Sequence, residues 1–228
     1  MKRRTLEALQ SARRGKRPVA VITDLSGGAE QLVDSGDLGG LRPELAEAVH
    51  QALRTDRAKR LGDRFIQPFP PPLRLLVVGA VHVAQKLVGM AKTADYDVAV
   101  IDPRPAFARA ARFGDGVTLE ADWPDEVIAR LRPDGRTAIV TLTHDPKIDD
   151  PGLVAALRSE AFYVGALGSR KTHQERCQRL RAEGLNEEAL ARIHGPVGLP
   201  LGGRSPAEIA ISIMAQITRV LRAPEGGQ

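Results

Sequence analysis

The chain has 228 residues, of which 43% are hydrophobic and 27% charged, a composition typical of a folded, water-soluble protein rather than a disordered or membrane-embedded one. No apolar run approaches the roughly 20 residues of a membrane-spanning helix, and the basic N-terminus lacks the apolar segment of a secretory signal. The net charge of +5 is dispersed along the chain with only two Tyr and one Trp, which disfavours nucleic-acid binding, and the single cysteine, Cys177, indicates a reducing cytoplasm.

Residues 1–67 are predicted to form a small α+β domain. The turn signal Ser26-Gly27-Gly28 separates two β-rich segments, and Pro43 stands where a helix would begin. A domain of about 70 residues is marginally stable, so contacts in a homodimer are a hypothesis for its stabilisation. The predicted elements are strands at 18–23, 29–33 and 64–67 and a helix at 43–53.

The prolines of residues 68–72 favour an extended linker, and after them the pattern changes. Short β-branched runs alternate with helical periodicity through residues 73–228. This alternation predicts a Rossmann-like parallel sheet with helices on both faces. The predicted strands are 73–78, 98–101, 117–119, 137–142 and 162–164, and the predicted helices include 84–91, 107–113, 127–131, 153–157, 169–182 and 187–193.

The last helix has the clearest start. Ser205-Pro206-Ala207-Glu208 is a capping box with proline at the first helical position. The apolar residues that follow repeat at helical spacing and form one buried stripe. They are Ile209, Ile213, Ile217 and Val220.

The turn after the first strand of the parallel sheet resembles a dinucleotide fingerprint, G-x-G-x-x-G/A. Gly79 and Ala84 match its first and third positions, whereas Val81 stands where the second glycine allows close approach of a pyrophosphate. Val81 therefore weakens NAD(P) binding, although the helix N-terminus still attracts an anion. The predicted cofactor-binding turn is Gly79, Ala80, Val81, His82, Val83 and Ala84.

Asp102 ends the second strand of the sheet, near the usual spacing for a carboxylate that binds ribose hydroxyls. Arg104 follows it and could favour a 2′-phosphate. A scaffold that has kept the turn but lost the cofactor is the competing interpretation.

Three further loops are predicted at the same edge of the sheet. Thr143, His144 and Asp145 follow the fourth strand, where Pro146 and the segment 149–151 predict a loop before the helix restarts. His144 could act in acid–base chemistry or donate a hydrogen bond, and Asp145 could orient it or hold an Asx turn. The ends of the first and fourth strands flank the predicted topological switch point, where open α/β sheets bind ligands.

Two glycine-rich loops complete this edge. The first loop, residues 165–171, contains two glycines and then a capping serine and two cations at the start of a helix. This arrangement suits a phosphate or another oxyanion. The second, residues 194–204, is either a plain connector or a second anion site at the start of the last helix. No spacing typical of a metal site is present. The predicted binding residues of these two loops are Gly165, Gly168, Ser169, Arg170, Lys171, His194 and Gly195.

At these loops the chain resembles the XdhC/CoxI family of xanthine dehydrogenase accessory factors. The resemblance covers 73–221 and rests on five ordered motifs. These are RLLVVGAVHVAQ, VIDPR, TLTHDPKIDDP, FYVGALGSRKTH and IHGPVGLPLGGRSPAEIA.

The resemblance implies a non-catalytic maturation factor in the cytoplasm. Such a factor binds the molybdenum cofactor (molybdopterin) transiently, holds it during sulfuration and assists its insertion into an apoenzyme such as xanthine dehydrogenase. A cysteine desulfurase is a further implied partner. Many relatives carry a cysteine in an S-G-G-C-V-E motif of a longer N-terminal domain, whereas this chain has Ala29, so no role of that cysteine transfers.

Two other functions stay open on the residues alone. One is a nicotinamide-dependent oxidoreductase with Asp102 on the ribose. The other is a cofactor-free interaction protein that docks partners on its α/β surface.

Overall fold

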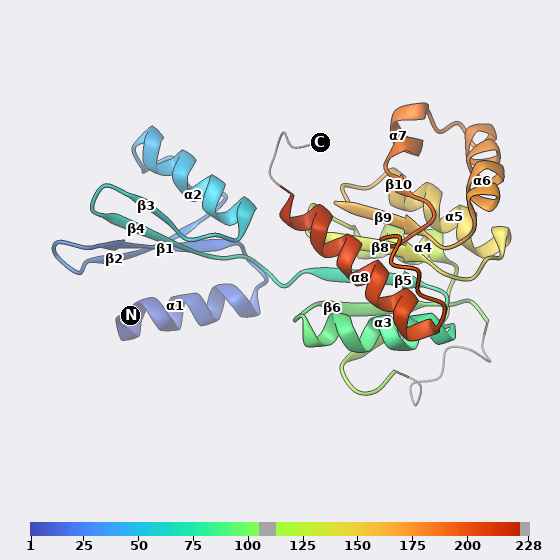
Figure 1. Cartoon of the computed structure of the whole chain (residues 1–228). Helices are drawn as coiled ribbons and strands as arrows, with labels where there is room; N and C mark the ends of the chain where they lie inside the picture. The colour runs from blue at the N-terminus through green and yellow to red at the C-terminus, as the bar shows by residue number, and fades with distance from the viewer. Residues whose placement is uncertain (105–112, 224–228) are drawn as a thin grey trace. The chain divides into compact units, whose positions relative to one another are not determined.

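The computed structural model describes residues 1–104 and 113–223 and divides into two compact units, Met1–Pro72 and Leu73–Gln228 (Figure 1). No helix in these described ranges is long and apolar enough to cross a membrane. Each unit has its own sheet and its own buried apolar clusters.

The first unit is an antiparallel sheet in the order β2-β1-β4-β3, with one helix on each face (Figure 1). Successive residues of β1 point to opposite faces, so Ala20 and Ile22 pack with α2 while Val19 packs with α1. The elements are α1 (Arg3–Arg14), β1 (Val19–Asp24), β2 (Glu30–Asp34), α2 (Pro43–Thr55), β3 (Lys59–Leu61) and β4 (Arg64–Phe69).

Two elements of this unit were not predicted. Helix α1 buries only Thr5, Leu9 and Ala12, and this narrow stripe is hidden among basic residues in the sequence. Strand β3 is a short polar edge strand. The predicted linker is also shorter than expected, because Pro68 and Phe69 belong to β4, where they lie opposite Ala20 and Val19.

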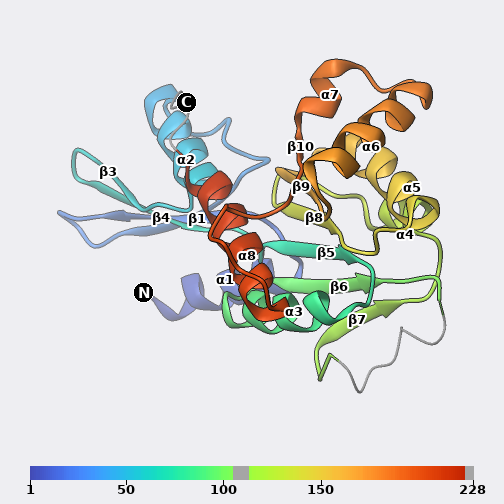
Figure 2. The same ribbon diagram turned by 45° about the vertical axis from the view of Figure 1, so that its right-hand side comes forward.

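The second unit confirms the predicted Rossmann-like fold. Its six strands are parallel in the order β10-β9-β8-β5-β6-β7, and β5, β6 and β7 are seen side by side in Figure 2. The strands are β5 (Arg74–Val78), β6 (Asp97–Ile101), β7 (Val117–Glu120), β8 (Thr137–Thr141), β9 (Tyr163–Ala166) and β10 (Ile193–His194). The helices are α3 (His82–Thr93), α4 (Pro124–Leu131), α5 (Pro146–Leu157), α6 (Arg170–Ala182), α7 (Glu187–Ala191) and α8 (Pro206–Arg222).

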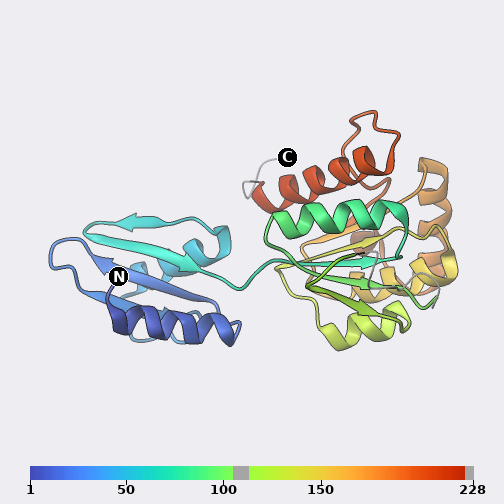
Figure 3. The same ribbon diagram turned by 90° about the horizontal axis from the view of Figure 1, so that it is seen from below.

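Helices cover both faces of this sheet. Leu75 and Val77 of β5 pack into the cluster that contains α3 and α8, and these two helices lie side by side in Figure 3. Leu76 and Val78 pack on the opposite face, in the cluster with α4, α5, α6 and α7. The apolar run of β5 is therefore buried on both sides, as expected for a central parallel strand.

Several boundaries and elements differ from the prediction. Helix α5 begins at Pro146, which occupies the first helical position, and Pro151 lies inside the helix rather than before it. Strand β9 continues through Gly165 and Ala166, and β10 was not predicted. The helix expected at 107–113 lies, except for Phe113, outside the described residues.

The capping box of α8 is present. The Glu208 backbone N–H donates to Ser205 Oγ at 3.3 Å, and the Glu208 carboxylate accepts from the Ser205 N–H at 2.8 Å and the Ser205 hydroxyl at 2.9 Å. Backbone N–H groups of Ser205 and Arg204, with the Ser205 hydroxyl, lower the pKa of Glu208 to about 2.

Replacement Ser205→Ala tests this cap. We expect it to lower the free energy of unfolding by about 1 kcal/mol and to raise the pKa of Glu208, because it removes the hydroxyl from both hydrogen bonds. Urea denaturation and an NMR titration of the Glu208 side chain measure the two effects. The control is Thr218→Ala on the exposed face of the same helix, for which a change within about 0.5 kcal/mol is expected. Equal losses of unfolding free energy in the two variants would contradict the assignment of Ser205 as the cap of α8.

Candidate functional site

The carboxyl ends of β5, β8, β9 and β10 share one edge of the parallel sheet. The chain leaves β5 toward β6 and β7 and later returns on the other side of β5 with β8, so the strand order reverses between β5 and β8. Such a switch point is where open α/β sheets bind ligands.

The β5–α3 turn and the β8–α5 loop touch at this point. Gly79 has φ +105°, and a Cβ built on it would lie 2.5 Å from Thr143 Cγ2 and 3.2 Å from the Thr143 backbone nitrogen. Only glycine therefore fits between the two loops in this conformation. The sequence predicted both loops separately, and the structure brings them into contact.

The N-terminus of α3 lies in the same turn and has no side-chain cap. Its N-cap residue is Val81, whose side chain cannot accept a hydrogen bond, so the first-turn N–H groups of His82, Val83 and Ala84 have no side-chain acceptor among the described residues. By contrast, Asp145 caps α5 by accepting from the Lys147 N–H at 3.0 Å.

Helix α6 is also capped, because Ser169 Oγ accepts from the Thr172 N–H at 3.1 Å. Of the three helices that follow β5, β8 and β9, α3 is thus the one in which no side chain of the described residues accepts from a first-turn N–H group, so all of these groups are available to an external anion.

Asp102 is fully buried, and both of its carboxylate oxygens are engaged within the protein. Oδ2 accepts from the Ala80 N–H at 2.8 Å, and the Arg104 guanidinium donates through Nε and Nη2 to Oδ1 and Oδ2 at 2.9 and 2.8 Å. Burial opposes ionisation, but the hydrogen bonds from Arg104 and Ala80 outweigh it and lower the pKa of Asp102. The carboxylate therefore fixes the β5–α3 turn, which is not the arrangement expected for a carboxylate that binds ribose.

The β8–α5 loop is held by a residue that the sequence interpretation did not single out. Buried Asp149 accepts from the Thr143 hydroxyl at 2.7 Å and from the His144 N–H at 3.1 Å, which keeps His144 in a left-handed conformation with φ +64°. Asp145 does not hydrogen-bond to the His144 ring in this structure. Its carboxylate serves as the cap of α5 instead.

The anion-binding residues predicted around the β9–α6 loop have two different environments in the structure: one lies inside β9, and the others lie at the start of α6. Gly165 lies inside β9, where the missing Cβ makes room for Tyr163 and Val197, so it is a packing residue. Gly168 begins the turn into α6, with Ser169 as the cap. The side chains of Arg170 and Lys171 are exposed at the start of the helix, where they would add positive charge near a bound anion.

His194 ends β10 and lies opposite Gly165 of β9. Its ring stacks on Tyr163 with a centroid distance of 4.6 Å and an interplanar angle of 8°, and burial lowers its pKa. The neighbouring Gly195 leaves space for the ring of His173. At the start of α8, where a second anion site was the alternative to a plain connector, the Glu208 carboxylate already accepts from the N–H groups of Arg204 and Ser205.

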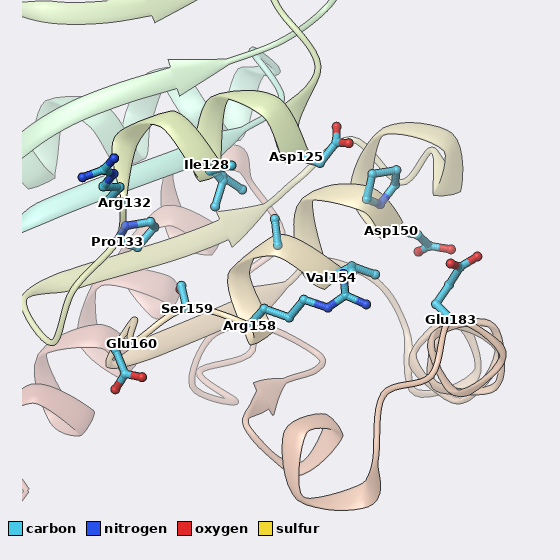
Figure 4. A pocket seen from close by; sticks show the side chains of 13 residues that line it. Asp125, Ile128, Arg132, Pro133, Asp150, Val154, Arg158, Ser159, Glu160 and Glu183 are labelled. Carbon is cyan, nitrogen blue, oxygen red and sulfur yellow. The ribbon is translucent and has the colours of Figure 1, made fainter.

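A pocket of about 730 Å³ lies elsewhere, between α4 and α5 and beside the end of α6. Ile128, Val154 and Arg158 are among the side chains around it (Figure 4). It receives no residue from the ends of the parallel strands, so it is separate from the site described above. Within residues 1–104 and 113–223, no group of three or more His, Cys, Asp or Glu side chains could hold a metal ion.

The chain is similar in sequence to a known protein family. The model of the XdhC Rossmann domain matches residues 75–217. The molybdenum cofactor insertion chaperone PaoD of Escherichia coli is 32% identical over 152 residues, which cover 67% of this chain and 41% of PaoD. A protein of Bacillus subtilis described as a probable xanthine dehydrogenase subunit is 29% identical over 153 residues, which cover 67% of this chain and 44% of that protein.

A crystal structure described as a xanthine dehydrogenase from Bacillus halodurans has the same fold. It superposes with a TM-score of 0.74 at 24% identity and covers 98% of this chain and 66% of that one. The chain spans less than half the length of the two curated relatives. Because the family model matches more than half of the chain and includes the β5–α3, β8–α5 and β9–α6 loops, this chain belongs to the XdhC family.

Proposed function

We propose that this chain binds the molybdenum cofactor and holds it for insertion into a molybdenum hydroxylase such as xanthine dehydrogenase. The observation that carries the proposal is the uncapped N-terminus of α3 at the switch point between β5 and β8. Membership of the XdhC family and the similarity to the insertion chaperone PaoD support it.

The residues present fit the phosphate of such a cofactor. The N–H groups of His82, Val83 and Ala84 point out of the helix start, where the helix dipole favours negative charge. Gly79 brings this turn against Thr143, and Arg170 and Lys171 carry positive charge at the start of α6, which follows β9 at the same edge of the sheet. The cofactor itself supplies a molybdenum atom held by a pterin dithiolene, while the chain binds and orients it.

The proposed role is to carry the cofactor and release it to the apoenzyme. Sulfuration of the cofactor while it is held, with a cysteine desulfurase as the sulfur donor, belongs to the same proposal. His144 and His194 are proposed to line the space beyond the phosphate. A second candidate function, nicotinamide-dependent oxidation, gains no support from the site, because Asp102 is engaged with Ala80 and Arg104.

Binding can be tested with the cofactor released from a molybdenum hydroxylase under anaerobic, reducing conditions. The protein is mixed with it and passed through a desalting column, and molybdenum and pterin are measured in the protein fraction. Stoichiometric retention is expected. Absence of both from the protein fraction would contradict the proposal.

Replacement His82→Pro tests the α3 N-terminus itself. Proline is tolerated at the first helical position and follows Val81, whose extended backbone (ψ 176°) suits a residue before proline, so the helix start is retained while one N–H is lost. Loss of one hydrogen bond to a charged phosphate is expected to weaken binding roughly tenfold to a hundredfold. His82→Ala is the matched control, because it removes the imidazole and keeps the N–H. If the two variants retain the cofactor equally, this N–H does not bind it.

A further inference from the structure

Arg176 of α6 is a buried charge that the proposed function does not use. Its exposed fraction is 2%, and its Nη2 donates to the Leu167 carbonyl at 2.8 Å. Its Nε and Nη1 are buried and have no hydrogen-bond partner in the part of the chain that the structure describes. A guanidinium carries five N–H donors, and burying them without acceptors costs free energy. Arg176 can therefore bind more acceptors than the described residues supply.

Thr141, at the end of β8, supplies a second buried polar group. Its hydroxyl has no hydrogen-bond partner among the described residues. Because side chains alternate along a strand, Thr141 points to the same face of the sheet as Ile139, which packs in one cluster with Leu180 of α6. The backbone of Leu167 joins the two groups: its N–H donates to the Thr141 carbonyl at 2.9 Å, and its carbonyl accepts from Arg176. Both groups thus lie at the carboxyl ends of β8 and β9, on the face that α6 covers.

The guanidinium of Arg176 also lies against the start of α6. A Cβ placed on Gly168 would lie 3.6 Å from its Nη2, and Gly168 immediately precedes Ser169, the N-cap of the helix. Ser169 accepts from one first-turn N–H group, whereas those of Arg170 and Lys171 have no side-chain acceptor among the described residues. The helix dipole and the buried positive charge therefore favour an anion at the same end of α6.

We infer that Arg176 is the buried binding group of an oxyanion site at the start of α6, and that the ligand of this site is a phosphate-type oxyanion. A tetrahedral oxyanion accepts from Nη2 together with Nε or Nη1, the two-donor arrangement in which arginine binds phosphate. The Thr141 hydroxyl is a further donor to the same ligand. Since atoms of the protein cover Nε and Nη1, the oxyanion takes the place of the Leu167 carbonyl when the β9–α6 loop moves aside.

This oxyanion site is separate from the N-terminus of α3, which carries the proposed function. Helix α3 packs against one face of the parallel sheet, and α6 packs against the other. The inference therefore goes beyond the proposed function. Two sources can supply the phosphate: a free phosphate ion, or a further phosphate group of the bound cofactor.

Titration with inorganic phosphate at constant ionic strength, followed by NMR, tests the site. Constant ionic strength matters because salt alone screens surface charges. Saturable shifts are expected in the Arg176 Nε–H signal and in the amide signals of Gly168 and Arg170. Amide signals of residues 82–84 report the α3 N-terminus separately. Absence of saturable shifts at Arg176 and Gly168 would overturn the inference, whatever happens at α3.

Replacement Arg176→Met keeps an unbranched side chain and removes the charge. It should weaken the phosphate binding reported by Gly168 at least tenfold, because charge-assisted hydrogen bonds are lost. The matched control is Arg179→Met, one turn further along α6, which removes an equal charge from a partly exposed pair with Asp150 and should change the phosphate affinity less than about twofold. Equal phosphate affinity of Arg176→Met and the unmodified protein would overturn the site.

Thr141→Val provides a second variant if Arg176→Met does not fold, since valine has the shape of threonine and suits a buried strand. Loss of one hydrogen bond to a charged phosphate should weaken binding roughly tenfold at Gly168 and leave the signals of residues 82–84 unchanged. Unchanged phosphate affinity at Gly168 in this variant would contradict the inferred site.

The same titration on protein loaded with the cofactor separates the two sources. A site filled by a phosphate group of the cofactor no longer responds to inorganic phosphate, whereas a site for a free ion still does. Because the first titration needs inorganic phosphate alone, failure of the protein to retain the cofactor would contradict the proposed function and leave the oxyanion site intact.

Discussion

Gly79→Ala is expected to lower the free energy of unfolding by about 3 kcal/mol. Two costs combine. The backbone at Gly79 has φ +105°, which a residue with a Cβ rarely adopts, and that Cβ would lie 2.5 Å from Thr143 Cγ2. The close contact between the added Cβ and Thr143 is relieved only if the β5–α3 turn and the β8–α5 loop move apart. A folded variant should therefore also lose retention of the molybdenum cofactor. Urea denaturation and the desalting assay measure the two effects.

Gly89→Ala is the matched control for this replacement. Gly89 lies on the exposed face of α3, and a Cβ there would meet nothing within 4 Å. Alanine in place of glycine inside a helix is expected to stabilise the protein by up to about 1 kcal/mol. If Gly79→Ala unfolds at the same urea concentration as the unmodified protein, the close contact between the two loops is wrong.

The sequence predicted the parallel sheet because its signals are local. The run at 74–78 is buried on both faces, and the strand–helix alternation repeats after it. The capping box at Ser205 and Glu208 was also predicted, since it depends on residues three positions apart.

The elements that were missed depend on contacts between distant segments. Strand β10 has two residues and exists because they pair with Val164 and Gly165. The packing role of Gly165 was not predicted, because nothing near it in the sequence indicates that Tyr163 and Val197 occupy the space beside it. Arg176 lies in a helix rich in charged residues, so its burial cannot be read from the pattern.

The same limit applies to the N-termini of the helices at the site. Sequence spacing predicted anion binding near α3 and α6, and left it as an alternative to a plain connector near α8. In the structure these helices differ in whether a side chain of the protein already accepts from a first-turn N–H group. Ser169 accepts from the Thr172 N–H in α6 and Ser205 accepts from the Glu208 N–H in α8, whereas no side chain of the described residues does so in α3. The valine that weakens a dinucleotide fingerprint at position 81 is also the residue that leaves α3 uncapped.

Asp102→Asn is expected to lower the free energy of unfolding by about 2 kcal/mol at neutral pH. The amide keeps the size of the side chain, but it removes the charge that pairs with Arg104 and turns an N–H₂ toward donors on Arg104 or Ala80. The partial exposure of Arg104, 33% of its side chain, keeps this loss below that of a fully buried pair. Asp122→Asn, on an exposed carboxylate 3.4 Å from Arg130, is the control and should change stability by less than about 0.5 kcal/mol.

The pH dependence of the stability lost in Asp102→Asn tests whether the ionised carboxylate is its cause. Because the pKa of Asp102 is lower in the folded protein than its ordinary value of 3.8, its contribution is present above pH 3.8 and is lost as the pH falls through the folded-state pKa. The unmodified protein and Asp102→Asn should therefore converge in stability in acid and differ most at neutral pH. A difference that does not shrink in acid would show that packing, rather than charge, explains the loss. Saturable NADH binding that disappears in Asp102→Asn would instead return this carboxylate to the role of a ribose ligand.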